Sequence, residues 1–136
     1  MRKIFTLLTL ALVALAANAV QVKFYLPSVD HVESLIIDGK EYQLSAGGLL
    51  YLDITKTCTW TLTLVDPYVI AQSSCKNTWD TGDSQEYRLS TNFKNTYTDK
   101  IEVYEGLTYV SYRFSTVNNN DVRKNTAEIN VYGDPT

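Results

Sequence analysis

Cys58 and Cys75 are the only two cysteines in the chain, and they begin and end the segment CTWTLTLVDPYVIAQSSC. Such a pair can serve as a disulfide, as a redox centre or as half of a metal site. Redox pairs usually have C-x-x-C spacing, and a metal site needs further Cys or His ligands, for which His31 is the only histidine present. The spacing therefore favours a structural disulfide between Cys58 and Cys75.

The same segment predicts an antiparallel hairpin that turns around Asp66 and Pro67. Both cysteines are equally far from that centre, so a symmetric hairpin places them directly opposite one another, within reach of a disulfide. A four-residue loop over residues 65–68 suits proline better than a two-residue turn. We expect the bridge to contribute about 3 kcal/mol by restricting the unfolded chain.

Nucleophilic catalysis of the Ser-His-Asp or Cys-His type would depend on His31, in the segment SVDHVES. The adjacent Asp30 and Glu33 do not form a triad with it, and nucleophile-elbow spacing is missing from the sequence. We interpret His31 as a histidine in a surface loop. With both thiols assigned to a disulfide, we expect a protein that is not an enzyme and needs no cofactor or metal.

Carboxylates gather in the segment WDTGDSQE, which contains Asp80, Asp83 and Glu86 around Gly82. Such a loop could hold calcium or flank a glycosidic bond, although its spacing differs from that of an EF-hand. An acidic connection between two strands explains the same residues and is the favoured interpretation.

Aromatic residues are abundant, with ten Tyr, two Trp and four Phe. Many are expected in a β-sheet core, and Trp60 is one of these. Trp79, beside the acidic loop, and Tyr97 are harder to assign to the core, and exposed rings near polar groups can stack on sugars or form protein interfaces. The candidate ligand-binding residues are Trp79, Asp80, Asp83 and Tyr97.

The first nineteen residues, MRKIFTLLTLALVALAANA, have the features of a secretory signal peptide. Arg2 and Lys3 precede a short apolar run, and Ala17 and Ala19 form an A-x-A cleavage site. We expect cleavage after Ala19, a secreted or periplasmic protein with no membrane insertion afterwards, and one domain over residues 20–136.

The charge of that domain is acidic. The whole chain has 12 basic and 15 acidic residues, and removal of Arg2 and Lys3 leaves 10 basic residues, a net charge of about −5. This balance disfavours nucleic acid as a partner. The remaining basic residues are scattered along the sequence, which is typical of a solvated surface.

Short runs rich in Val, Ile, Thr and Tyr, separated by turn residues, predict an all-β domain. In the longest run, Val110, Tyr112 and Phe114 alternate with polar residues and are expected in the core. The predicted strands cover residues 21–26, 32–37, 41–44, 49–54, 59–65, 68–72, 85–90, 101–104, 108–117 and 127–132. Many short strands of this kind indicate an antiparallel β-sandwich.

Two segments, VKFYLPSVDHVESLIIDGKEYQLSAGGLLYLDI and TWTLTLVDPYVIAQS, resemble the small β-sandwich modules in exported proteins of gut-dwelling Gram-negative bacteria. The resemblance covers residues 20–73 and concerns strand and turn positions. It implies an immunoglobulin-like or related sandwich at the cell envelope or outside the cell, with an adhesive, scaffolding or glycan-associated role.

The sequence is compatible with three functions. The first is a non-catalytic module that binds a protein or a cell-surface component. The second is a carbohydrate-binding module that uses Trp79 and nearby tyrosines. The third is a small hydrolase that uses Asp80, Asp83 or Glu86.

Overall fold

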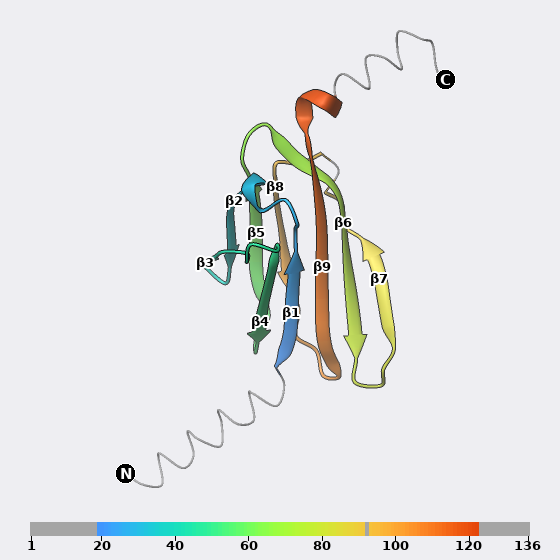
Figure 1. The fold of residues 1–136 in the computed structure, drawn as a ribbon. Coiled ribbons are helices and arrows are strands. Elements are labelled where there is room, and N and C mark those ends of the chain that lie inside the picture. Colours follow the sequence, from blue (N-terminus) through green and yellow to red (C-terminus); the bar gives the residue numbers. More distant parts are fainter. Residues whose placement is uncertain (1–18, 92, 123–136) are drawn as a thin grey trace, which may run out of the picture.

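The computed structural model describes residues 19–91 and 93–122, and these residues form an all-β fold, as the alternating pattern predicted (Figure 1). The predicted signal peptide and the predicted strand at 127–132 lie outside the described residues, apart from Ala19. The elements are β1 (Val20–Tyr25), the 3₁₀ turn η1 (Val29–His31), β2 (Val32–Ile37), β3 (Lys40–Tyr42), β4 (Leu49–Ile54), β5 (Cys58–Leu64), β6 (Tyr68–Trp79), β7 (Ser84–Arg88), β8 (Thr96–Ile101) and β9 (Leu107–Asn118).

The strands form two sheets. One has five strands in the order β4-β1-β9-β6-β7, and the other has four in the order β3-β2-β5-β8. All pairs are antiparallel except β1 and β9, which are parallel, with Val22 beside Val110. The prediction of a purely antiparallel arrangement was therefore wrong at this pair. Parallel neighbours need a long connection, and here nearly the whole domain lies between the two strands.

One hydrophobic core receives side chains from both sheets. Phe24 of β1 lies edge-on to Trp60 of β5, with ring centroids 5.2 Å apart, and stacks on Tyr112 of β9 at 4.9 Å. Phe114 adds a further edge contact to Trp60 at 5.7 Å. The predicted burial of Val110, Tyr112 and Phe114 is confirmed. These contacts determine which faces of β1, β5 and β9 point to the core and which point to solvent.

The predicted hairpin and its disulfide were wrong. β5 and β6 belong to different sheets, because the chain crosses from one sheet to the other between Leu64 and Tyr68. Cys58 lies opposite Ile101 of β8, whereas Cys75 lies between Tyr87 of β7 and Tyr112 of β9. Both cysteines are buried free thiols. The apolar face of β5 is covered by a second sheet, so its continuation crosses over instead of folding back beside it.

Several strands differ from their predicted ranges by one or two residues, and β6 and β8 differ by more. β6 extends to Trp79, beyond its predicted end at 72, and contains an irregularity between Ile70 and Gln72 where it pairs with β9. β8 covers Thr96–Ile101, before the predicted range 101–104. The extra length of β6 matters because its polar half forms the centre of an open sheet surface.

Candidate functional site

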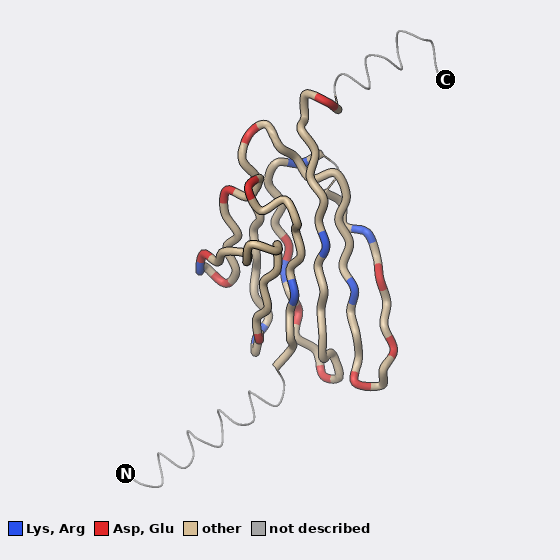
Figure 2. Tube along the Cα trace, viewed as in Figure 1, with Lys and Arg blue, Asp and Glu red and all other residues tan. Residues whose placement is uncertain are grey.

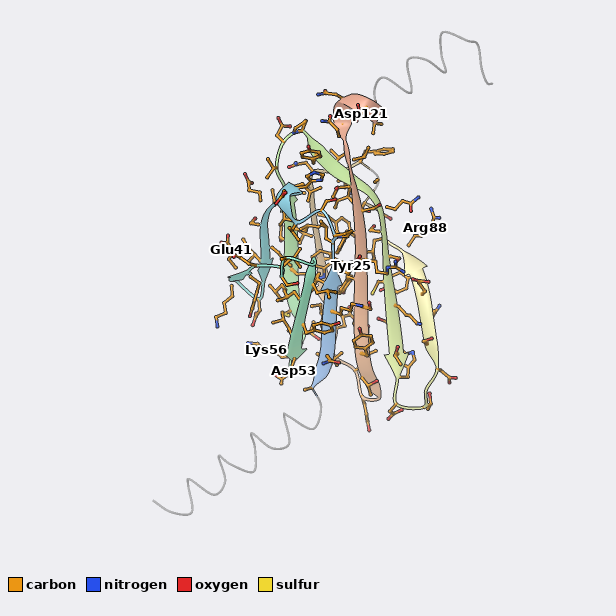
Figure 3. All side chains as sticks on the ribbon, in the orientation of Figure 1. Tyr25, Glu41, Asp53, Lys56, Arg88 and Asp121 are labelled. Carbon is orange, nitrogen blue, oxygen red and sulfur yellow. The ribbon has the colours of Figure 1, made fainter. Side chains whose placement is uncertain are left out.

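A groove of about 740 Å³ lies along the solvent-facing side of the five-stranded sheet. β6, β7 and β9 form most of its surface, and the end of β1 closes one side. Polar and charged side chains that line it include Gln72, Ser74, Glu86, Arg88 and Arg113, with Tyr25 at the β1 side. In Figure 3, Tyr25 lies over the middle of this sheet and Arg88 at its β7 edge.

Strand register positions the central residues of the groove. Ser74 of β6 pairs with Arg88 of β7 on one side and with Arg113 of β9 on the other. Ser73 and Cys75 are buried in the interior, so Ser74 between them faces solvent. The Ser74 hydroxyl donates to Oε2 of Glu86 at 3.4 Å. The two guanidinium groups therefore lie on either side of a small hydroxyl residue.

A second row of outward residues follows along the same sheet face. Lys23 of β1 pairs with Ser111 of β9, which pairs with Lys76 of β6, which pairs with Glu86 of β7. Lys23 also places its Nζ 5.8 Å from the centre of the Tyr25 ring. Lys23, Lys76, Arg88 and Arg113 thus form a group of four cations, which we call the cationic face.

Figure 2 shows blue segments on β1, β9, β6 and β7, the strands that carry these cations, and a red segment on β7, while most other red segments lie in loops and around β2 and β3. Among residues 19–91 and 93–122, the single salt bridge joins Lys100 and Glu102, on the other sheet and the loop after it. None of the four cations forms a salt bridge within the described structure, although Glu86 lies directly opposite Lys76 and carries the opposite charge. The face is therefore available to an anionic ligand.

Trp79, Asp80 and Asp83 lie in and beside the hairpin between β6 and β7. The Trp79 amide donates to the Asp83 carbonyl at 2.9 Å, and the Asp80 amide donates to the Gly106 carbonyl at 2.7 Å. The Asp83 carboxylate accepts from the Thr81 hydroxyl at 3.1 Å. The acidic segment is a connection between strands, which was the favoured interpretation of its sequence.

Trp79 does have an aromatic neighbour. Its ring centroid lies 6.2 Å from that of Tyr104, which is 48% exposed, at an interplanar angle of 33°. The two rings form a small aromatic patch at the end of β6. That Trp79, Asp80 and Asp83 bind a ligand remains a prediction.

Tyr97 lies apart from these residues, on β8 of the four-stranded sheet. Its ring packs on Trp60 at 5.7 Å, and its hydroxyl donates to Oδ2 of Asp99 at 3.4 Å. The four predicted ligand-binding residues consequently occupy two regions of the fold, and none of them lines the groove.

His31 belongs to η1, where its ring stacks on Tyr68 with centroids 3.5 Å apart. Its Nδ1 lies 2.7 Å from the Thr116 hydroxyl. The expected surface loop histidine is thus a half-buried residue whose ring connects η1 to β6 and β9.

The two thiols lie in the interior. Cys75 is 1% exposed, and burial raises the pKa of its thiol, while hydrogen bonds to Tyr87 and Tyr112 partly offset the increase. Burial likewise raises the pKa of the Cys58 thiol, with a smaller contribution from Asp38. Both groups are neutral at physiological pH, which makes them poor nucleophiles.

Sequence reasoning missed the cationic face. Lys23, Lys76, Arg88 and Arg113 are far apart along the chain and were interpreted as scattered surface charge. The alternation within each strand indicates that each of them faces solvent. Only the pairing of β1, β9, β6 and β7 brings them together.

Within the described residues, no three His, Cys, Asp or Glu side chains gather closely enough to hold a metal ion. The same part of the chain contains no helix that is long and apolar enough to cross a membrane. Comparisons with known proteins place the chain in no family, since no protein-family model, curated protein or solved structure matches it.

Proposed function

We propose that this protein is a non-catalytic binding module with an immunoglobulin-like β-sandwich fold, exported by its N-terminal leader to the periplasm or the cell exterior. Two sheets that share one aromatic core are consistent with a sandwich. Its partner is a component of the cell surface, which binds to the outer face of the five-stranded sheet.

The groove over β6, β7 and β9 is the single observation that carries this proposal. Its polar side chains project from paired strands, so the backbone that carries them is fixed before a ligand arrives and little backbone entropy is lost on binding. The four cations of this face form no salt bridge within the described structure. These charged side chains do not pack in the core, and they are suited to binding an anionic ligand.

The aromatic patch of Trp79 and Tyr104 supports the second candidate function, a carbohydrate-binding module centred on the end of β6. A half-buried Trp beside an exposed Tyr can stack on a sugar ring. The groove is preferred because it combines volume, hydrogen-bonding groups and charge, whereas the patch consists of two rings.

A glycan array and a panel of immobilised surface proteins test the two sites against each other. Ser74→Tyr fills the centre of the groove, and Trp79→Ala removes the larger ring of the aromatic patch. We expect the purified protein to lose binding with Ser74→Tyr and to keep it with Trp79→Ala. The opposite result would assign function to the aromatic patch, and binding that survives both changes would contradict both sites.

A further inference from the structure

We infer that the ligand of the groove is a linear acidic polysaccharide whose carboxylates pair with the cationic face. This inference rests on the proposed function, since it names the ligand class of the same face. The polymer lies across β9, β6 and β7. Carboxylates of its sugar units bind Arg88 and Arg113, and carboxylates of further sugar units reach Lys23 and Lys76.

Charge distribution is the first support. Residues 20–136 contain ten Lys and Arg, and four of these lie on one face of one sheet. Glu86 and, at the β4 edge, Asp53 are the acidic residues that the described strands place on that face. An acidic protein with one cationic face attracts a polyanion to that face and repels it elsewhere.

Spacing is the second support. Neighbouring strands lie about 4.8 Å apart, so Arg88 and Arg113, which are two strands apart, are separated by about 10 Å at their Cα atoms. Lys23 and Lys76 have the same separation across Ser111. One small anion cannot reach all four cations, whereas a polymer with a carboxylate on each sugar supplies several anions at once. Arginine is suited to this role because its guanidinium binds a carboxylate through two parallel hydrogen bonds.

The other side chains of the face distinguish a polysaccharide from an acidic peptide. Between the cations lie Gln72, Ser74, Ser111 and Ser115, which can hydrogen-bond sugar hydroxyls. Tyr51 of β4 is 54% exposed and offers a flat ring beside Lys23. Peptide interfaces usually contain a central apolar pocket for an anchoring side chain, and the groove lining is predominantly polar.

Affinity electrophoresis of the purified protein tests the inference with polygalacturonate and with the same polymer after full methyl esterification. The two polymers have the same backbone and differ in charge. We expect retardation by polygalacturonate that weakens as NaCl is added, and little retardation by the ester. Equal retardation by both polymers would overturn the inference.

Variants assign the interaction to the face. The double variant Arg88→Gln, Arg113→Gln should weaken binding at least about tenfold, because it removes two charge-assisted contacts to sugar carboxylates. The matched control, Lys40→Gln with Lys100→Gln, removes the same charge from the four-stranded sheet and should leave binding unchanged. Equal loss in both double variants would overturn the inference, since it would indicate attraction by net charge alone.

Polyglutamate and single-stranded DNA serve as competitors of other chemical classes. We expect neither to displace polygalacturonate at equal charge concentration, and displacement by either would overturn the assignment to a polysaccharide. If neutral glycans alone bind, and Ser74→Tyr blocks them, the proposed function stands and the acidic ligand is wrong. If no ligand depends on Ser74, the proposed function fails as well.

Discussion

Arg88 and Arg113 lie on opposite sides of β6, and both pair in register with Ser74. Two like charges in this arrangement repel each other weakly, and within the described structure neither has a carboxylate partner in a salt bridge. Neither arginine therefore has an evident role in stability. The arrangement is explained better by recognition of an anion than by the requirements of the fold.

Replacing both arginines should leave the fold intact. We expect Arg88→Gln with Arg113→Gln to change the free energy of unfolding by no more than about 0.5 kcal/mol, as is usual at exposed sites without partners. Urea denaturation followed by tryptophan fluorescence measures this. A loss above about 1 kcal/mol would show that the arginines have a structural role and would weaken the case for recognition.

Reducing agents should not affect stability, because Cys58 and Cys75 are free thiols on different sheets. We expect the same Tm with and without dithiothreitol, and two thiols titrated by Ellman's reagent after unfolding. In the folded protein, both should react slowly, because burial raises the pKa of each thiol. A decrease of several degrees in Tm on reduction would contradict the structure.

Alkaline pH should destabilise the protein because it favours deprotonation of the buried Tyr112 hydroxyl, which is easier in the unfolded chain. Burial raises the pKa of Tyr112 well above its ordinary value of 10.0, and the nearby Cys75 adds to the increase. The folded pKa exceeds the unfolded one, so the stabilisation is complete below about pH 10 and is lost as pH rises further, by up to about 1.4 kcal/mol per pH unit.

Tyr112→Phe should therefore flatten the decrease in unfolding free energy between pH 9.5 and 11, with Tyr51→Phe on the solvent face as the control. Urea denaturation at a series of pH values measures both slopes. Some decrease should remain, because burial also raises the pKa of Cys75. Identical slopes in the protein and in Tyr112→Phe would contradict the burial of this hydroxyl.

Gly48 is required where the chain enters β4. Its φ is +84°, and a Cβ there would lie 2.3 Å from the Leu26 carbonyl oxygen. Gly82 has a similar φ of +92° with nothing within 4 Å of an added Cβ. We expect Gly82→Ala to cost about 1 kcal/mol for the backbone alone, and Gly48→Ala to cost at least about 2 kcal/mol more. Equal costs would show that the close approach to Leu26 is absent.

Much of the fold could be predicted from alternation within strands. The expected burial of Trp60 is confirmed, and Cys58, Leu62 and Leu64 are buried on the same face of β5. The strand expected to pair with β5 was wrong, because a strand shows the same alternation whether its successor folds back beside it or crosses to another sheet. The Cys58 and Cys75 pairing failed for this reason.

The candidate site was less predictable than the fold. Lys76, Arg88 and Arg113 become neighbours through the pairing of β6 with both β7 and β9, and nothing in their local sequence indicates that pairing. Trp79 and Asp80 were predicted to bind a ligand because they lie close in sequence to further acidic residues. Residues that are close in sequence belong to the hairpin between β6 and β7. The groove, in contrast, depends on the pairing of β6 with β9, which is distant in sequence.

Backbone amide NMR during titration with a short oligogalacturonate locates the bound ligand on the fold. If the cationic face is the binding site, the largest chemical-shift changes occur at Ser74, Lys76, Arg88 and Arg113, and those of Thr98 and Lys100 on the other sheet do not change. Largest changes at Trp79 and Tyr104, or at β8, would contradict it.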